Sequence, residues 1–413
     1  MEHVIVGAGP AGITAAETLR EIDPTARVRV IGDEPEPPYS RMAIPYFLMA
    51  RIGEQGTHLR VEPDHFAKRG IEIVHGRVEG VDTTRRLLRL GDGSELGYDR
   101  LLIATGSSPV RPPISGLDLP GVLSCWTLED AREIHRRAVA GSRVALIGAG
   151  FIGSIVLEAM AIRGCSLTVI ERGERLVPRM MGPEAGELIR RWCESRGVQV
   201  HTGASVEAIE RAGSSLRVKL GDGDTVDAEV VISAIGVRPN VGFLAGSGVD
   251  IDLGIRVDRR FRSSAADIYA AGDVAQGLDF STGEDAVHAI QPTATDHGHV
   301  AALNMAGQEA EYEGSINMNV LDTLGLISCS FGLWMGRDGG ESATLYQPDD
   351  YRYLSLQFAD DRLIGAHAVG MTQHVGVLRG LIQRRTPLGE WQPRLLRDPT
   401  RIMEAYLATT QVI

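Results

Sequence analysis

The chain has 413 residues, enough for two to four domains at roughly 100 to 200 residues each and too many for a peptide hormone or a lone binding module. Its 42 basic and 54 acidic residues give a net charge of -12, which argues against general nucleic-acid binding because phosphate contacts need a basic surface. The cysteines form no C-x-x-C pair, so we expect no redox dithiol, iron–sulfur cluster or other metal site; they are Cys125, Cys165, Cys193 and Cys329.

Neither a secretory signal nor a membrane span is predicted. No basic or long apolar segment precedes the first apolar stretch at 4–6, and later apolar runs are interrupted by charges such as Glu158 and Arg163. A transmembrane helix needs about 20 mainly apolar residues. We therefore expect a soluble, cytoplasmic protein with no membrane contact.

The first element is a short apolar strand that runs into a glycine motif and then into a helix. Gly7 permits the turn, Gly9 lets backbone approach a pyrophosphate, and Gly12 allows close packing of helix on strand. A second strand, 28–31, is followed by Asp33 and Glu34, where an acidic residue would meet a ribose hydroxyl. This segment predicts a dinucleotide site.

The same design returns in the middle of the chain. Gly148, Gly150 and Gly153 follow an apolar strand, and the next strand, 167–170, ends at Glu171. The duplication extends further, because L-G-D-G at 90–93 and again at 220–223 precedes an apolar strand ending in glycine. The first copy is longer, and its P-E-P-P-Y-S-R-M-A-I-P-Y segment accounts for much of the excess. Two dinucleotide sites are therefore predicted.

Two such sites suit electron chemistry, in which one holds a flavin and the other a nicotinamide that delivers hydride to it. The alternative is a fused pair of nicotinamide domains. An apolar strand that ends in Gly272 and Asp273 favours the flavin, because it places a carboxylate at a strand end beside a cofactor. A merely structural turn aspartate is the other interpretation of Asp273.

Several motifs together resemble the FAD-dependent pyridine nucleotide-disulfide oxidoreductase superfamily over essentially the whole chain. They are G-A-G-P-A-G, I-A-T-G at 103–106, G-A-G-F-I-G, A-I-G-V-R-P-N at 234–240 and I-Y-A-A-G-D at 268–273. The resemblance implies an α/β fold with two Rossmann-like domains and a C-terminal α+β dimerisation domain. It places the FAD-binding domain at 1–115 and 241–315, the NAD(P)-binding domain at 116–240, and the dimerisation domain at 316–413.

The resemblance also implies the cofactor contacts, although it assigns no catalytic residue. For FAD these are Gly7, Gly9, Pro10, Ala11, Gly12, Asp33 with Glu34 as the alternative, Arg41, Val78, Ala104, Thr105, Gly106 and Asp273. For NAD they are Gly148, Gly150, Phe151, Ile152, Gly153, Glu171 and Gly236. The D-E-P-E-P-P-Y-S-R segment resembles ferredoxin, rubredoxin and nitrite reductase flavoproteins, in which an arginine eight residues after the acid reaches the pyrophosphate; Asp33 and Arg41 keep that spacing.

Departures from the family pattern narrow the chemistry. Met42 stands where disulfide reductases and NADH oxidases or peroxidases of the superfamily carry a redox cysteine, and a thioether cannot form a sulfenate or mixed disulfide. Tyr46 occupies the position of a flavin-proximal lysine in ferredoxin-reductase relatives. Ile155 replaces a glutamate that meets the nicotinamide end in many relatives, and the nearest acid is Glu158.

Three histidines and a basic segment near the C-terminus have both structural and functional interpretations. His297 and His299 are interpreted as helix histidines on a helix that starts near Pro292, and the role of His288 stays open. Six arginines against two acids make residues 379–401 basic. This surface could dock an acidic electron carrier, but a solvated helix face or dimer contacts are favoured.

The sequence thus predicts an FAD enzyme that accepts hydride from NADH and passes electrons to a non-disulfide acceptor, such as a small redox protein or an oxygenase or reductase component. Alternatives are an NADH oxidase or a quinone or small-molecule reductase and, in another class, a redox-sensing subunit with a degenerate NAD site. Glu171 favours NADH over NADPH, although Arg172 beside it could receive a 2'-phosphate. We expect a homodimer.

Overall fold

The computed structural model describes residues 1–410 and divides into two compact units. Unit 1 comprises Met1–Ser108 and Val237–Ser315, and unit 2 comprises Pro109–Gly236 together with the chain from Ile316 onward. The chain leaves unit 1 before the predicted boundary at 115 and returns before the one at 240. The stretch predicted as the NAD(P)-binding domain lies in unit 2 except for residues 237–240, and the stretch predicted as the C-terminal domain also belongs to unit 2.

Unit 1 is built on a parallel five-stranded sheet with the order β19-β7-β1-β2-β3. Its strands are β1 (Glu2–Val6), β2 (Arg27–Gly32), β3 (Ile71–His75), β7 (Arg100–Ile103) and β19 (Ile268–Ala270). The strands are rich in Val, Ile and Leu because both faces of the sheet are covered, as is usual for parallel sheets.

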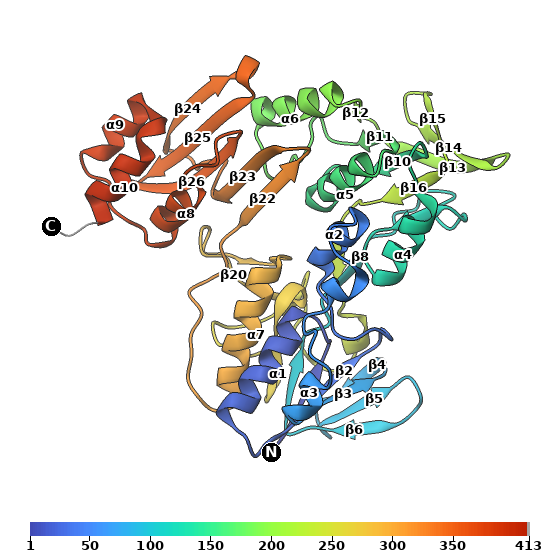
Figure 1. The fold of residues 1–413 in the computed structure, drawn as a ribbon. Helices are drawn as coiled ribbons and strands as arrows, with labels where there is room; N and C mark the ends of the chain where they lie inside the picture. The colour runs from blue at the N-terminus through green and yellow to red at the C-terminus, as the bar shows by residue number, and fades with distance from the viewer. Residues whose placement is uncertain (411–413) are drawn as a thin grey trace. The chain divides into compact units, whose positions relative to one another are not determined.

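Two helices from distant parts of the chain pack side by side over one face of this sheet (Figure 1). They are α1 (Pro10–Ile22) and α7 (Gln291–Met305), and α7 begins where the sequence predicts. The close approach depends on Gly298, since a Cβ there would lie 2.2 Å from the carbonyl oxygen of Ala11. The helix α1, which follows the first glycine motif, therefore packs against both the sheet and α7.

Smaller elements complete unit 1. A three-stranded antiparallel sheet comprises β4 (Val78–Asp82), β5 (Leu87–Leu90) and β6 (Glu95–Gly97), and another sheet comprises β18 (Ile255–Arg256), β20 (Ala275–Leu278) and β21 (Asp285–Ala286). Short helices are η1 (Arg41–Ala43), α2 (Ile44–Leu48), η2 (Glu54–Thr57), α3 (His65–Lys68), η3 (Gly242–Leu244) and η4 (Gly272–Val274). The pair β8 (Ser107–Pro109) and β17 (Val237–Pro239) lies where the chain passes between the units.

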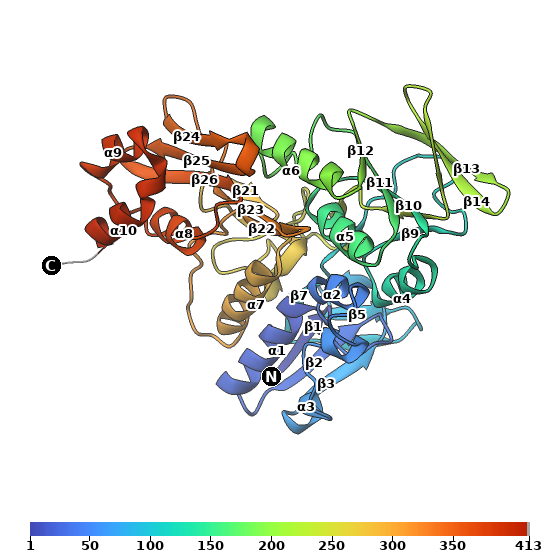
Figure 2. The same cartoon turned by 45° about the horizontal axis from the view of Figure 1, so that its top comes forward.

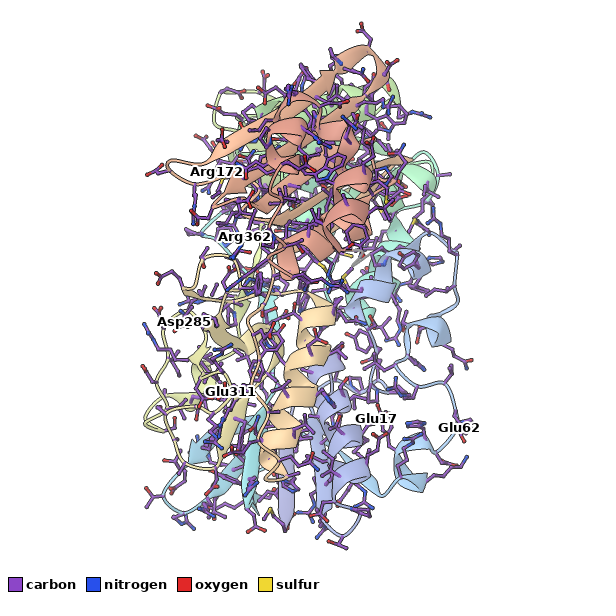
Figure 3. The ribbon with its side chains drawn as sticks, turned by 90° about the vertical axis from the view of Figure 1, so that its left-hand side faces the viewer. Glu17, Glu62, Arg172, Asp285, Glu311 and Arg362 are labelled. Carbon is purple, nitrogen blue, oxygen red and sulfur yellow. The ribbon has the colours of Figure 1, made fainter. Side chains whose placement is uncertain are left out.

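Ionic contacts fasten the loop before α3 to α1. The Glu17 carboxylate accepts hydrogen bonds from Arg60 and, at 2.8 Å, from the His65 ring, while Lys68 pairs with Glu62 at 2.9 Å. Figure 3 shows Glu17 on its helix and Glu62 on the facing loop. The later part of the long segment between β2 and β3 is held against α1 in this way.

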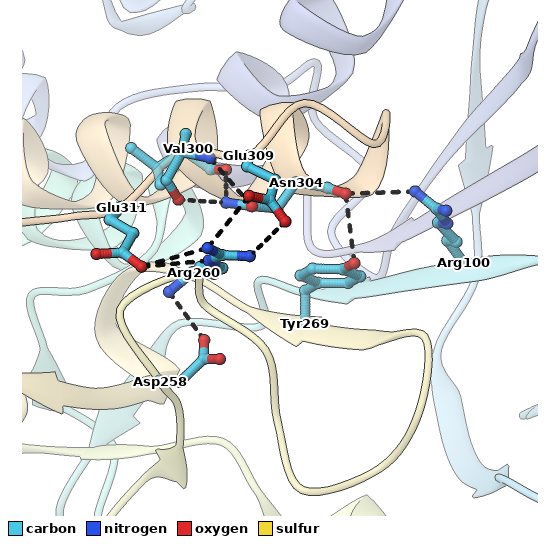
Figure 4. A network of polar contacts seen from close by, with 9 residues as sticks. Arg100, Asp258, Arg260, Tyr269, Val300, Asn304, Glu309 and Glu311 are labelled. Atoms are coloured by element: carbon cyan, nitrogen blue, oxygen red, sulfur yellow. Dashed lines mark hydrogen bonds and ion pairs between the residues drawn. The ribbon is translucent and has the colours of Figure 1, made fainter.

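A second polar network fastens the last segment of unit 1 (Figure 4). Arg260 pairs with Glu309 at 2.9 Å and with Glu311 at 3.4 Å. The Asn304 amide donates to the carbonyl oxygens of Val300 and Ala310. The chain after α7 is therefore held in place as far as the end of the unit.

The first half of unit 2 repeats the plan of unit 1. Its parallel sheet has the order β12-β11-β10-β16-β9 and comprises β9 (Val122–Ser124), β10 (Arg143–Ile147), β11 (Ser166–Glu171), β12 (Gln199–Thr202) and β16 (Val230–Ser233). Its helices are α4 (Leu128–Arg137), α5 (Phe151–Ile162) and α6 (Pro183–Ser195) (Figure 2). The antiparallel strands β13 (Val206–Ala212), β14 (Ser215–Leu220) and β15 (Thr225–Ala228) repeat β4-β5-β6, with each D-G turn between the last two strands.

The second half of unit 2 is an antiparallel sheet with helices. The strand order is β22-β23-β26-β25-β24, with bounds β22 (Met318–Thr323), β23 (Leu326–Gly332), β24 (Glu341–Gln347), β25 (Arg352–Ala359) and β26 (Arg362–Val369). The helical segments are η5 (Pro348–Asp350), α8 (Val375–Gln383), α9 (Trp391–Arg397), η6 (Pro399–Arg401) and α10 (Ile402–Thr410). The helix α8 packs on β23 and β26, and α9 packs on β24.

Candidate cofactor sites

The first glycine motif forms a cradle at the carboxyl end of β1. Gly7 has a φ of +116°, and a Cβ there would lie 2.0 Å from the carbonyl oxygen of Ala104. A Cβ on Gly12 would lie 2.0 Å from the carbonyl oxygen of Gly7, whereas one on Gly9 would meet nothing within 4 Å. Gly7 and Gly12 are therefore required by packing, and Gly9 leaves open space at the N-terminus of α1. That arrangement fits a pyrophosphate held by helix amides.

The neighbouring strand β7 leads into Ala104, Thr105 and Gly106 beside this cradle. The amide of Ala104 donates to the carbonyl oxygen of Val6 at 2.7 Å. Thr105 donates through its hydroxyl to the carbonyl oxygen of Asn240 at 3.0 Å, and the Asn240 amide donates back to the Thr105 carbonyl at 2.9 Å. Asn240 ends the A-I-G-V-R-P-N motif, but the sequence assigns it no contact of its own. Val78 begins β4 and is buried.

Arg41 is held by a ring of side chains that the sequence did not connect. Its guanidinium donates to Glu34 Oε1 at 2.5 Å and to the Tyr39 hydroxyl at 2.8 Å, and Tyr39 in turn donates to Glu34 Oε2 at 2.5 Å. Asp33, the acid expected to accompany Arg41, is exposed. Glu34 is thus the acid that orients Arg41, and the ribose contact of Asp33 stays a prediction.

Asp273 lies in η4, directly after β19, and Ser107 donates to its Oδ2 at 2.7 Å. Burial raises the pKa of the Asp273 carboxyl above its usual range, while the Ser107 hydrogen bond and the positive charge of Arg41 oppose that rise. Asp273 and Arg41 therefore belong to one electrostatic neighbourhood. Ser107 was missed at the sequence level because a serine after A-T-G carries no chemical signal of its own.

Unit 1 contains no cysteine, and the expected redox position is Met42. The side chains of Met42 and Tyr46 are both well exposed, at 41% and 48%. All four cysteines of the chain are free. Burial raises the pKa of Cys125, Cys193 and Cys329 to about 12 in each case, so these thiols stay protonated near neutral pH.

The second glycine motif forms an equivalent cradle in unit 2. Gly148 has a φ of +94°, and a Cβ there would lie 2.6 Å from the carbonyl oxygen of Ala234. A Cβ on Gly153 would lie 2.0 Å from the carbonyl oxygen of Gly148, and one on Gly150 would meet nothing within 4 Å. Gly236 has equally open surroundings. The residues present fit a second dinucleotide at the N-terminus of α5.

Glu171 ends β11 beside this cradle. Its Oε2 accepts a hydrogen bond from the Ala149 amide at 2.7 Å, and its Oε1 accepts one from the Gly173 amide at 2.6 Å. The carboxylate therefore shapes the glycine loop, and each oxygen keeps a lone pair for a further donor. Arg172, the next residue, is exposed (Figure 3).

The side chains at the start of α5, next to this cradle, are mainly apolar. Phe151 and Ile152 begin the helix and are partly exposed, as is Ile155. Glu158 is only 6% exposed, so the acid nearest to Ile155 in sequence is largely withdrawn from solvent.

The three histidines near the Gly-Asp motif have different surroundings. Nδ1 of His297 accepts from the Gly272 amide at 3.4 Å, and its Nε2 donates to the Ser315 hydroxyl at 2.9 Å. Nε2 of His288 is hydrogen-bonded to Asp279 Oδ2 at 2.7 Å, and both side chains are buried. His299 is exposed on α7. His297 and His299 are thus helix histidines, as expected from the sequence.

The basic C-terminal surface is partly neutralised within the chain. Arg394 pairs with Glu390 at 2.7 Å, and Arg401 pairs with Glu404. Both guanidiniums lie over the Trp391 ring. These pairs agree with a solvated helix face.

Within residues 1–410, no group of three or more His, Cys, Asp or Glu side chains is placed to hold a metal ion. In the same range, no helix is both long and apolar enough to cross a bilayer.

A glycine cradle in each unit and a carboxylate at the strand end of unit 1 define an oxidoreductase with two dinucleotide sites. Residues 1–297 match the family described as pyridine nucleotide-disulphide oxidoreductase, and the chain belongs to this family. It is an FAD-dependent pyridine nucleotide oxidoreductase, which confirms the class of enzyme and the two cofactors predicted from the sequence.

Curated relatives cover most of the chain. It is 31% identical to the NADH-dependent phenylglyoxylate dehydrogenase subunit epsilon of Aromatoleum evansii, over 99% of this chain and 98% of the relative. It is 33% identical to the ferredoxin–NAD(+) reductase component of the anthranilate 1,2-dioxygenase system of Burkholderia cepacia, over 98% of both chains. An NADH oxidase of Methanocaldococcus jannaschii is 32% identical, over 78% of this chain and 73% of the relative.

The fold is also that of a solved reductase. Putidaredoxin reductase, in its covalent complex with putidaredoxin, superposes with a TM-score of 0.90 at 24% identity and covers 100% of this chain and 99% of that chain. This likeness confirms the predicted fold class.

Proposed function

We propose that the enzyme takes hydride from NADH and passes electrons to a small iron–sulfur or rubredoxin-type protein that serves a larger oxygenase or reductase system. The observation that carries this proposal is the presence of both dinucleotide cradles in a chain whose flavin-side unit contains no thiol. When bound, the nicotinamide supplies a hydride and the flavin takes it up and can release single electrons.

The residues of the chain have binding and orienting roles in this scheme. The open space at Gly9 and the amides of α1 would hold the FAD pyrophosphate, and Arg41 would supply a positive charge to it. The matching space at Gly150 would hold the pyrophosphate of NADH. Because Met42 cannot become a thiolate, electrons must leave the flavin for the acceptor without a covalent intermediate on sulfur.

The choice of acceptor rests on the relatives that match end to end. One is named as a ferredoxin–NAD(+) reductase component and another as an NADH-dependent dehydrogenase subunit, and both include the segment corresponding to residues 316–413. The same segment is expected to form the homodimer, which sedimentation velocity would test.

The test is anaerobic stopped-flow mixing of the flavin-loaded protein with NADH, followed by a screen of acceptors. We expect flavin bleaching and then rapid reoxidation by a [2Fe–2S] ferredoxin or a rubredoxin, with little reoxidation by coenzyme A disulfide. Absence of bleaching would instead support the alternative of a sensing subunit with a degenerate NAD site, for which Ile155 is the sequence support.

NADH oxidase activity is the second candidate, favoured by the relative of that name. The same reduced protein mixed with air-saturated buffer distinguishes the two. Reoxidation by dioxygen that is faster than by every protein acceptor would favour the oxidase.

The donor should be NADH rather than NADPH. The Glu171 carboxylate lies at the strand end where the adenosine ribose would be, and it would repel a 2'-phosphate. We expect the wild type to have a higher kcat/KM with NADH than with NADPH. Glu171→Gln should bring the two values of kcat/KM closer together. Arg172→Ala is the matched control, since it should weaken NADPH use alone; a wild-type preference for NADPH would contradict the assignment.

A further inference from the structure

The Asp273 carboxylate is not free to turn. Ser107 donates to one of its oxygens, Oδ2, at 2.7 Å. A carboxylate has two oxygens, and a hydrogen bond at one of them fixes the direction in which the other presents its lone pairs. The orientation of Oδ1 therefore depends on where the Ser107 hydroxyl is held.

The backbone fixes Ser107 firmly. Its side chain is only 4% exposed, and it begins β8, which pairs with β17. The Asn240 amide donates to the carbonyl oxygen of Gly106 at 3.0 Å, and Asn240 is bonded to Thr105 through its side chain as well. Ser107 thus projects from a backbone that is hydrogen-bonded on both sides of Gly106.

The turn that carries Asp273 is fixed independently of Ser107. The Gly272 amide donates to His297 Nδ1, and a Cβ on Gly272 would lie 3.2 Å from the Cβ of Ala11 on α1 and 3.5 Å from that of Ala294 on α7. Loss of the Ser107 hydroxyl should therefore alter the carboxylate while leaving the turn in place.

The charge balance also depends on Ser107. Arg41 is the charged side chain whose field acts on Asp273, and it is shared with Glu34. Burial favours the neutral acid, whereas Ser107 and Arg41 favour the carboxylate. A carboxylate accepts a hydrogen bond from a cofactor hydroxyl more strongly than a neutral acid does.

We infer that Ser107 is a positioning residue for FAD, which favours the charged form of the Asp273 carboxyl and aims it so that its second oxygen can accept a hydrogen bond from the cofactor. The inference rests on the proposed contact between Asp273 and FAD. It adds a residue at the connection between the two units to the FAD site.

The test is the FAD affinity of the apoprotein, measured by flavin fluorescence quenching between about pH 5 and pH 8. Ser107→Ala should weaken FAD binding about tenfold at neutral pH, because a hydrogen bond to a charged group is lost. It should also move the acid limb of the affinity profile to higher pH, since Asp273 loses a group that favours its charged form. Ser107→Thr, which keeps the hydroxyl, should restore both properties.

The variant Asp273→Asn tests whether Ser107 acts through the Asp273 carboxylate. It should abolish the acid limb, and adding Ser107→Ala to it should change FAD affinity little, because the group on which Ser107 acts is no longer ionisable. Ser142→Ala is the matched control, since it removes a buried serine hydroxyl in unit 2 that is also hydrogen-bonded.

The outcomes separate the two claims. If Ser107→Ala lowers affinity equally with and without Asp273→Asn, and leaves the pH profile unmoved, the role of Ser107 as a positioning residue is overturned. If Asp273→Asn itself binds FAD like the wild type at every pH, the underlying contact between Asp273 and FAD is overturned instead.

Discussion

Arg41 lies between two acidic groups in unit 1. It bonds directly to Glu34, and its charge also acts on Asp273. The bonds to Glu34 and Tyr39 hold the guanidinium in a defined orientation, and its positive charge and planar fork suit a diphosphate. Glu34 and Tyr39 therefore orient Arg41 for an anionic ligand.

Arg41→Ala should weaken FAD binding by about 10- to 100-fold, the equivalent of about 1.5–3 kcal/mol for a charged hydrogen bond. The measurement is the ratio of flavin to protein after dialysis. Arg69→Ala, an exposed arginine after α3, is the control. Full retention of flavin by Arg41→Ala would count against a pyrophosphate role.

The sequence predicts the roles of some residues of the candidate site and not of others. The glycines could be predicted because each has a steric reason that a motif records. The roles of Glu34, Tyr39 and Ser107 could not be predicted, because a hydrogen bond between side chains depends on the paths of the segments that carry them. For Glu34 and Tyr39 this is the segment after β2, and for Ser107 it is the segment after β7; no periodic pattern fixes either path.

In each cradle, the glycines required for packing differ from the glycine that leaves space for a ligand. Gly9 and Gly150 have ordinary negative φ values and open surroundings, whereas a Cβ added to Gly12 or to Gly153 would lie 2.0 Å from a carbonyl oxygen. An added methyl group therefore has different consequences at the two kinds of position.

Gly9→Ala should fold with a melting temperature close to that of the wild-type apoprotein but bind FAD weakly. Gly150→Ala should keep its FAD and show a raised KM for NADH. Gly12→Ala and Gly153→Ala, the matched pair, should lower stability by several kcal/mol because backbone must move. Thermal melts of the apoproteins and flavin titrations check this; strong FAD binding by Gly9→Ala would show that the open space is not the pyrophosphate site.

The duplication was predictable because its turns and glycines recur in order, and both copies form parallel sheets flanked by an antiparallel three-stranded sheet. The fifth strand of each sheet lies outside its own copy. In unit 1 it is β19, the apolar strand before Gly272 and Asp273 that the sequence predicts. In unit 2 it is β9, which precedes its own copy and was not predicted. A strand as short as Val122–Ser124, with no fully buried residue, has too weak a pattern to be recognised.

In the whole molecule, the distribution of thiols predicts a route for electrons that involves no cysteine. All four cysteines lie in unit 2, and none belongs to the FAD cradle. Replacing all four by serine or alanine should leave NADH-driven ferricyanide reduction largely intact, apart from packing losses at the three buried positions. Assays of ferricyanide and coenzyme A disulfide reduction check this. Wild-type disulfide turnover that disappears with one cysteine would place the protein among the thiol-dependent members of its family.

Three buried histidines should make the molecule sensitive to mild acid. Burial lowers the pKa of His3 to about 4, with the Arg100 charge acting in the same direction, and it lowers the pKa of His297 to about 3 and that of His367 to about 4. Each is lower in the folded state than the usual 6.5, so the unfolded chain binds more protons. Stability should be complete above about pH 6.5 and fall as the pH drops towards 4.

Mild acid should destabilise unit 1 more than unit 2. Of the three histidines, His3 and His297 lie in unit 1, and only His367 lies in unit 2. A shift of about two units or more is worth about 3 kcal/mol per histidine, a large part of the stability of a domain. All four tryptophans lie in unit 2, so their fluorescence follows that unit, while release of FAD follows unit 1. Between about pH 6.5 and pH 5, the FAD-release temperature should therefore fall more steeply than the tryptophan transition.

Substitution of the histidines tests the cause directly. His3→Asn should flatten the pH dependence of FAD release, and His367→Asn that of the tryptophan transition, whereas His75→Asn, at an exposed position on β3, should change neither. The window avoids the carboxyls whose pKa is lowered, such as Glu17 and Asp279, because these lose their contribution only below about pH 4.5. The pKa of the Asp273 carboxyl is raised, so this group also affects FAD release, and only the part of the slope that His3→Asn removes belongs to the imidazole. Equal slopes in the wild type and in both variants would assign the acid sensitivity to groups other than the buried imidazoles.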